Sequence, residues 1–158
     1  MIIRQIDKQD NDRIKQIIQD SLKSLGLAIP GTAYYDPQLG ELYQYYNSLK
    51  HANYWVVEQD KEIVGGIGIA PYNEQDRVCE LQKLYLTPQA QGLGIAKKLM
   101  ETALSFASQY YTMCYLETKH ELKAACRLYE RYGFQLLQEP LPGSEHSAMD
   151  AWYIKELH

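Results

Sequence analysis

The stretch Gln89-Ala90-Gln91-Gly92-Leu93-Gly94 lies between an apolar run that ends at Thr87 and an amphipathic run that begins at Ile95. Two glycines one residue apart let the backbone turn tightly and approach a ligand without obstruction by side chains. A helix that follows such a turn offers its unpaired N–H groups and the positive end of its dipole to an anion. The stretch therefore predicts a strand, a glycine-rich turn and a helix that together bind a diphosphate.

Two other phosphate-binding turns do not fit this spacing. A P-loop requires Ser or Thr after its Gly-Lys pair, whereas Lys97-Lys98 is followed by Leu99. A Rossmann turn requires a third glycine at the position of Lys97. The pattern that remains is Gln-x-x-Gly-x-Gly at a strand-to-helix junction.

The strand expected over Val78 to Thr87 changes the phase of its apolar residues. Cys79 and Leu81 share one face under period-two alternation, whereas Leu84 and Leu86 fall on the opposite parity. One inserted residue produces such a change, so the pattern indicates a β-bulge. A simple phase slip in a buried strand is the alternative.

A bulge near Gln82 or Lys83 would bend this strand away from the next one, expected over Thr112 to Glu117. The backbone groups of Leu84 to Leu86 would then be free to pair with an extended ligand that carries amides.

A third motif follows the strand that ends at Glu117. It reads Ala124-Ala125-Cys126-Arg127-Leu128-Tyr129-Glu130-Arg131-Tyr132-Gly133-Phe134. The run predicts a helix from about Leu122 to Tyr132, because Gly133 is a natural left-handed cap, and a strand that starts at Phe134.

Together these motifs resemble the GNAT acetyltransferase family, whose acetyl-CoA pyrophosphate loop follows Gln/Arg-x-x-Gly-x-Gly/Ala. The resemblance extends from about Tyr54 to Tyr153. It implies acetyl-CoA as co-substrate, with pantetheine paired to Leu84, Tyr85 and Leu86. The residues expected to hold the pyrophosphate are Gln91, Gly92, Leu93, Gly94, Ile95, Ala96 and Lys97.

The resemblance also implies two catalytic residues. The family's Ala-x-x-Leu-Tyr-x-x-x-Gly-Phe run borders the cofactor thiol, and its tyrosine, Tyr129 here, commonly serves as the general acid. A Glu near the start of the bulged strand often acts as the general base, directly or through water; Glu80 has that position. Many members carry Asn where this chain has Leu122, so no side-chain hydrogen bond to the cofactor is expected there. A structural salt bridge is the alternative for Glu80.

Composition is consistent with one globular domain over residues 1–158. The chain is 46% hydrophobic and 23% charged, has no apolar run long enough to span a membrane, and lacks a signal-peptide layout at its start. A cytoplasmic location is therefore expected. The net charge of −4 is spread without a basic stripe, which argues against nucleic-acid and membrane partners.

The cysteines and histidines predict no metal site. Cys79, Cys114 and Cys126 have no metal-ligand spacing and are expected to be buried thiols. None of the four histidines is placed by sequence as the partner of a catalytic cysteine.

The order of elements predicts an α/β fold, with a central mixed, mostly antiparallel sheet of six to seven strands flanked by about four helices. The first helix is expected to be capped by Asp10 and the second to begin at Asp36-Pro37. The other helices are expected over Ile95 to Ala107 and Leu122 to Tyr132. Strands are expected over Ile2 to Ile6, Tyr54 to Glu58, Glu62 to Ala70, Val78 to Thr87, Thr112 to Glu117, Phe134 to Gln138 and Ala148 to Glu156.

Two irregular segments are candidates for the acceptor site, because long loops often carry binding function. In the family that this chain resembles, the connection between the first two helices walls the acceptor site. That makes Tyr34 and Tyr35 candidate substrate contacts. His146, in the loop Glu139 to Ser147, is a candidate contact or second base. Tyr43 and Tyr46 are expected to pack in the core.

The predicted reaction is direct transfer of an acetyl group from acetyl-CoA to a primary amine of a small molecule or peptide. A non-catalytic CoA or acyl-CoA sensor of the same fold and a structural protein are the alternatives. The sequence leaves open the acceptor, the length of the acyl group and whether the protein is a monomer or a homodimer.

Overall fold

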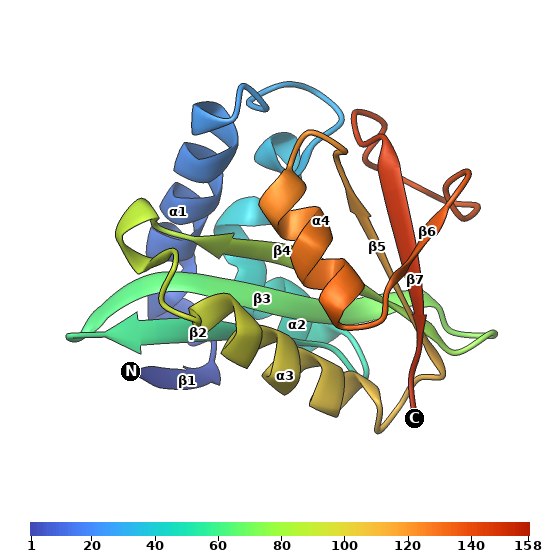
Figure 1. Ribbon diagram of the computed structural model, residues 1–158. Helices are drawn as coiled ribbons and strands as arrows, with labels where there is room; N and C mark the ends of the chain where they lie inside the picture. The colour runs from blue at the N-terminus through green and yellow to red at the C-terminus, as the bar shows by residue number, and fades with distance from the viewer.

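The computed structural model describes residues 1–158 and is built around a seven-stranded sheet with the order β1-β2-β3-β4-β5-β7-β6 (Figure 1). The strands are β1 (Ile2–Gln5), β2 (Asn53–Gln59), β3 (Glu62–Asn73), β4 (Val78–Leu86), β5 (Met113–Thr118), β6 (Gln135–Leu137) and β7 (Ala151–Glu156). The helices are α1 (Asn11–Ser24), α2 (Leu42–Ser48), α3 (Ile95–Ala107) and α4 (Lys123–Arg131). All neighbouring strands are antiparallel except β4 and β5. The predicted mixed, mostly antiparallel sheet with four helices is confirmed.

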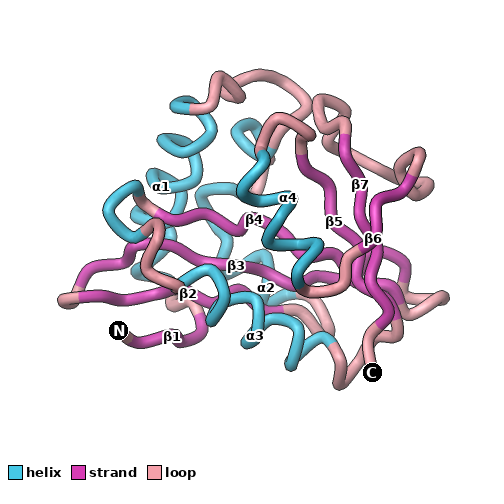
Figure 2. Tube along the Cα trace, viewed as in Figure 1, coloured by secondary structure: helices cyan, strands magenta, loops and turns pink.

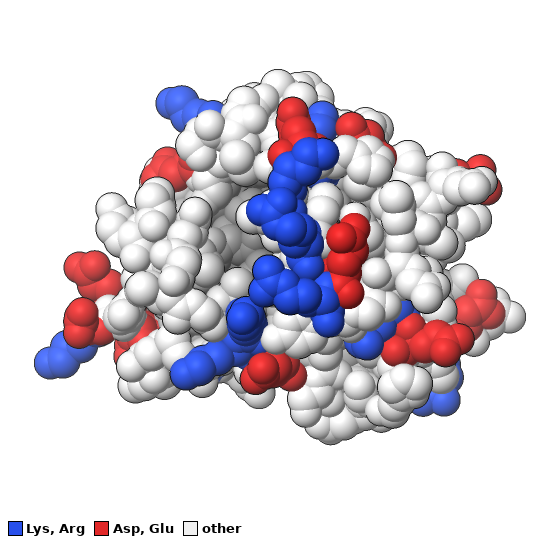
Figure 3. Space-filling view, in the orientation of Figure 1, with Lys and Arg blue, Asp and Glu red and all other residues white.

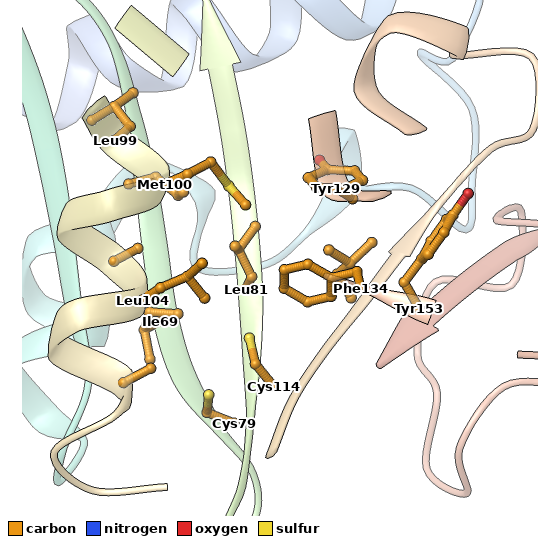
Figure 4. Packing of buried hydrophobic residues seen from close by; sticks show 14 of the residues in the cluster. Ile69, Cys79, Leu81, Leu99, Met100, Leu104, Cys114, Tyr129, Phe134 and Tyr153 are labelled. Atoms are coloured by element: carbon orange, nitrogen blue, oxygen red, sulfur yellow. The ribbon is translucent and has the colours of Figure 1, made fainter. Parts of the chain in front are cut away.

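The helices cover opposite faces of the sheet (Figures 1 and 2). α1 and α2 pack on one face, where Ile14, Ile18 and Leu42 are fully buried. α3 and α4 pack on the other face, where Leu99, Met100 and Tyr129 belong to a second cluster with Leu81 and Phe134 (Figure 4). β4 separates these two cores, so its side chains alternate between them.

The predicted bulge in β4 is confirmed. Gln82 is opposite Gly68 and Tyr85 is opposite Gly66, so two residues of β4 face the single residue Ile67 of β3. Lys83 has a φ of 52°, which identifies it as the residue that distorts the strand. Cys79 and Leu81 before the bulge, and Leu84 and Leu86 after it, therefore all pack toward the α3 and α4 core.

Two helix starts differ from the sequence prediction. Asp10 does not cap α1, because its carboxylate accepts hydrogen bonds from Arg4 at 2.8 Å and from the N–H of Asp7. Asp7 instead caps a short 3-10 turn, Lys8–Asp10, that leads into the helix. The second helix does not begin at Asp36-Pro37, because Asp36 forms side-chain contacts in the site described below; α2 begins at Leu42 after a 3-10 turn at Leu39–Glu41.

The last strand begins three residues later than predicted. The N–H of Ala148 donates to the carbonyl of Gly31 at 3.1 Å, so this residue ties two loops together instead of pairing in the sheet. Consequently, the loop before β7 lies against the loop after α1. None of the helices combines the length and the apolar character that crossing a bilayer requires.

Candidate active site

A cavity of about 400 Å³ lies where β4 and β5 separate. The two strands pair only from Val78 to Glu80 on β4, and beyond Glu80 no ladder joins them. The predicted site residues that line this cavity are Glu80, Leu84, Tyr85, Leu86, Gln91, Tyr129 and His146. The bulge thus produces the slot that the phase change predicted.

The glycine-rich turn lies at the N-terminus of α3 and has the conformation that an anion site needs. Gly92 and Gly94 both have a φ of 78°, and Gly94 immediately precedes the first helical residue, Ile95. Apart from the adjacent residues of the chain, no protein atom lies within 4 Å of a methyl group built on either glycine. The N–H groups of Gly92, Leu93 and Gly94 make no hydrogen bond to the backbone, and the first N–H groups of any helix lack intrahelical partners. These residues fit a diphosphate.

The other residues predicted to hold the pyrophosphate are Leu93, Ile95, Ala96 and Lys97. Neither these residues nor the two glycines line the cavity itself. They lie on the α3 side of the slot, next to Gln91, which does line it. The Nε2 of Gln91 donates to the carbonyl of Leu86 at 3.3 Å. A ligand that pairs with Leu86 would therefore compete with Gln91 for that carbonyl.

Basic side chains accumulate beside this slot. Figure 3 shows a column of Lys and Arg over α4 and the start of α3. Lys123, Arg127 and Arg131 follow one another at a spacing of four residues on α4, and all three are exposed. The expectation that the chain has no basic stripe was wrong on this face, because helical periodicity gathers charges that look scattered in the sequence. A positive surface here is suited to a polyanionic ligand.

Glu80 lies on β4 just before the separation of the strands and lines the cavity. Burial raises its pKa to about 7, although a hydrogen bond from Gln82 and the charges of His146 and Lys83 act in the opposite direction. The carboxylate of Glu117 on β5 also raises this pKa. A carboxylate with a pKa near 7 can accept a proton efficiently at neutral pH.

Tyr129 lies on α4 and lines the same cavity. Its ring is buried beside Phe134 and Tyr153, with ring centroids 6.0 and 6.2 Å away (Figure 4). Burial raises the pKa of its hydroxyl, which therefore stays protonated at neutral pH. The hydroxyl makes no hydrogen bond within the protein, and no fully buried side-chain polar atom lacks a partner, so this hydroxyl borders the open cavity. Such a group can donate a proton into the cavity.

A buried ionic cluster lies beside the cavity, and two of its members, Lys83 and His146, line it. The Nζ of Lys83 lies 2.8 Å from Oδ2 of Asp36, and the Nε2 of His146 lies 2.9 Å from Oδ1 of the same carboxylate. Only 4% of the Lys83 side chain and 13% of the Asp36 side chain are exposed. The cluster joins the bulge of β4 to both loops that the sequence indicated as acceptor loops.

Burial and the charged partners of Asp36 shift its pKa in opposite directions. Burial acts to raise the pKa of Asp36, but the hydrogen bond from His146 and the charge of Lys83 outweigh it and leave this pKa below its ordinary value. The hydrogen bond to Asp36 raises the pKa of His146 above 6.5, against the effect of burial. A His146 cation and an Asp36 anion therefore stabilise each other.

Sequence reasoning missed Lys83 and Asp36 as site residues. A lysine at the phase break of an apolar strand was the available signal for Lys83, whereas nothing local distinguishes Asp36. Glu117 was also missed. It lines the cavity and accepts hydrogen bonds from the hydroxyls of Tyr115 at 2.7 Å and Ser144 at 2.5 Å.

The structure places Tyr34 and Tyr35 in a 3-10 turn, Ala33–Tyr35, after a loop whose other residues reach the cavity. Neither tyrosine lines the cavity, and Tyr35 is 61% exposed. The residues between α1 and Tyr34 that line the cavity are Leu25, Leu27, Thr32 and Ala33. Met149, in the loop before β7, also lines it.

Comparison with known proteins establishes the family. Residues 15–134 match the model of the acetyltransferase (GNAT) family. YjgM, an uncharacterised N-acetyltransferase of Escherichia coli strain K12, is 41% identical over 159 aligned positions, which cover 99% of this chain and 95% of YjgM. The chain therefore belongs to the GNAT family of acetyltransferases and is an N-acetyltransferase, as the motifs predicted.

Solved structures share the fold. A GNAT-family acetyltransferase from Staphylococcus aureus Mu50 superposes with a TM-score of 0.88 over 99% of both chains, at 20% sequence identity. The protein yncA from Salmonella typhimurium, solved with its cofactor acetyl-CoA, superposes with a TM-score of 0.79. That match covers 100% of this chain and 94% of yncA, also at 20% identity.

Proposed function

We propose that this protein transfers the acetyl group of acetyl-CoA directly to a primary amine of a small molecule or peptide. The observation that carries the proposal is that Glu80 and Tyr129, from opposite sides of the β4–β5 slot, line one cavity. The first has a pKa of about 7 and the second stays protonated. One proton acceptor and one proton donor are the two groups that acyl transfer between an amine and a thioester requires.

The residues of the slot would bind the two ends of the coenzyme. The free N–H groups of Gly92, Leu93 and Gly94 and the first turn of α3, from Ile95 to Lys97, would hold the pyrophosphate. The backbone of Leu84, Tyr85 and Leu86 would pair with pantetheine. Held in this way, the acetyl group would meet the acceptor inside the cavity at a high effective concentration.

Each catalytic residue would move one proton. Glu80, or a water that it orders, would take a proton from the acceptor amine as its nitrogen forms the new bond to the acetyl carbon. Tyr129 would donate a proton to the sulfur as the carbon–sulfur bond breaks. The products are the acetylated amine and free CoA, and solvent exchange returns both residues to their starting states.

The acceptor would enter between the loop after α1 and the loop before β7. Leu25, Leu27 and Met149 from these loops line the cavity, and His146 contributes a polar wall. Tyr34 and Tyr35, near the entrance to this side, remain proposed contacts with the part of the acceptor that lies outside the cavity.

Calorimetric titration with acetyl-CoA, with desulfo-CoA and ATP as controls, tests the proposal. Saturable binding of acetyl-CoA and desulfo-CoA, but not of ATP, is expected, followed by amine-dependent thiol release in a screen of primary amines. Binding without thiol release from any amine would favour a CoA sensor. Absence of binding by folded protein would refute the proposal.

A further inference from the structure

A hydrogen-bonded chain connects the candidate base to the core beneath α2. The hydroxyl of Tyr46 donates to Oε1 of Gln82 at 2.6 Å, and Nε2 of Gln82 donates to Oε1 of Glu80 at 2.7 Å. Tyr46 is only 2% exposed, whereas Gln82 and Glu80 line the cavity. The chain therefore runs from a buried hydroxyl to the carboxylate at the reacting end of the slot.

The direction of each hydrogen bond is set by its chemistry. An ionised carboxylate only accepts, so the amide nitrogen of Gln82 must face Glu80. The amide oxygen then faces Tyr46, which donates its proton. Without that donor, Gln82 could rotate its amide and present the oxygen to Glu80, an arrangement that disfavours the ionised carboxylate.

Two glycines in β3 make room for this arrangement. A methyl group on Gly68 would lie 2.6 Å from the Tyr46 hydroxyl, and one on Gly66 would lie 2.8 Å from the Tyr54 hydroxyl. Tyr54 donates to the carbonyl of Lys83 at 2.8 Å, which holds the backbone of the bulge next to Gln82. The absence of side chains at Gly66 and Gly68 thus allows the hydroxyls of Tyr46 and Tyr54 to reach Gln82 and Lys83.

From this geometry we infer that Tyr46 and Gln82 are positioning residues for Glu80, and that they favour the ionised form of its carboxylate, with one oxygen held and the other free in the cavity. The inference rests on the proposed role of Glu80 as base. Neither residue touches the reacting atoms; they act through Glu80, and the Gln82 amide is the only side chain that donates a hydrogen bond to it.

Other ionisable groups also act on Glu80 and must be held constant in a test. They are Lys83 on β4, Glu117 and Cys114 on β5, Tyr72 on β3, Tyr45 on α2, and His146 in the loop before β7. Tyr46→Phe and Gln82→Met remove the chain without changing any of the charges in this set, because both residues are neutral at the pH of the assay. Tyr43→Phe, on the same helix, is the matched control.

The readout is the pH dependence of kcat/KM and the carboxyl titration of Glu80, followed by ¹³C NMR with Glu80→Gln used to assign the signal. Each variant should move the acidic limb and the NMR titration to higher pH by about one pH unit, the size of one lost hydrogen bond to a charged group. The activity at pH 7 should fall about fivefold, because the ionised fraction of Glu80 drops from about one half to about one tenth, and the KM for acetyl-CoA should not change. The double variant should behave like either single variant, because both break one chain.

Three results would overturn the inference. The first is an unchanged titration of Glu80 in variants whose thermal unfolding and CoA binding show a folded protein. The second is the same shift in Tyr43→Phe. The third is full activity of Glu80→Gln, which would refute the proposed role of Glu80 as the base. That failure can be distinguished from failure of the positioning role, because the NMR titration of the Tyr46→Phe protein reports on the hydrogen-bonded chain independently of turnover.

Discussion

The Nζ of Lys83 lies 2.8 Å from Oδ2 of Asp36, and both side chains are almost fully buried. Lys83 is the bulge residue of β4, and Asp36 lies in the segment between α1 and α2, so one ion pair connects the distorted strand to that segment. A buried charge is costly unless it is paired, so each of these two charges needs the other to be present.

Asp36→Asn should therefore destabilise the protein strongly. The substitution leaves the Lys83 cation buried with no anionic partner, and the free energy of unfolding should fall by about 3 kcal/mol. Denaturation with urea at pH 7 measures the change. The double variant Asp36→Leu with Lys83→Met is the control, because it removes both charges and should recover most of the loss. If Asp36→Asn were as stable as the wild type, the ion pair would not contribute to the free energy of unfolding.

His146 should add stability that depends on pH. Its pKa is raised in the folded protein by Asp36, so its contribution is complete below pH 6.5 and is lost as the pH rises through the folded value. The difference in unfolding free energy between wild type and His146→Gln should be largest near pH 6 and should shrink by pH 8. His120→Gln, which removes a histidine without such a pair, should show no corresponding trend. An equal difference at both pH values would contradict the predicted ion pair.

Glu80→Gln should lower turnover by about 100-fold, the size of a typical general-base effect. Below pH 7 the wild-type kcat/KM should fall as Glu80 takes up a proton. This acidic limb of the pH profile should be absent from the variant when both proteins are assayed with the same amine.

The same substitution should stabilise the protein at high pH. Burial raises the pKa of Glu80 from 4.5 to about 7, so the protonated carboxyl is the form that the folded state favours. Its contribution to the free energy of unfolding is complete below pH 4.5 and is lost as the pH rises through about 7. Unfolding at pH 8 should therefore require more free energy in Glu80→Gln, by about 2 kcal/mol. A variant that is both inactive and less stable would point to a structural role for Glu80.

Tyr129→Phe should lower kcat by about 100-fold while leaving the affinity for CoA nearly unchanged. The ring that packs beside Phe134 and Tyr153 is retained, and only the hydroxyl that borders the cavity is lost. Rapid-quench turnover and calorimetric CoA binding separate the two quantities. Tyr110→Phe, outside the cavity, is the control. Equal loss of turnover and of CoA binding would indicate that Tyr129 shapes the slot and is not the acid.

Gly92→Val should weaken CoA binding by at least about 100-fold, because its side chain would occupy the turn where the free N–H groups meet the ligand. A β-branched residue at a φ of 78° is also strained by about 1–2 kcal/mol. Gly26→Val has almost the same strain, with a φ of 73° and no atom within 4 Å of the added carbon, but lies away from the turn. The two variants should lose similar stability, and only Gly92→Val should lose CoA affinity in calorimetry.

The features of this protein that the sequence alone determined are those encoded in short stretches. The apolar phase of β4 predicted the bulge, because a strand must keep Cys79, Leu81, Leu84 and Leu86 in the same core. The two glycines, Gly92 and Gly94, predicted the start of α3 at Ile95, because glycines that permit a tight turn and are followed by an amphipathic run are typical of the beginning of a helix. The family followed from these local motifs and from the run that contains Tyr129.

Tertiary structure alone decided the contacts between distant segments. Lys83 meets Asp36 across 47 positions of the chain, and Tyr46 meets Gln82 across 36. No local periodicity encodes such pairs, since they arise only when the sheet brings α2 and the loop after α1 under the bulge. Burial in that assembly, and not the identity of the residue, raises the pKa of Glu80 to about 7.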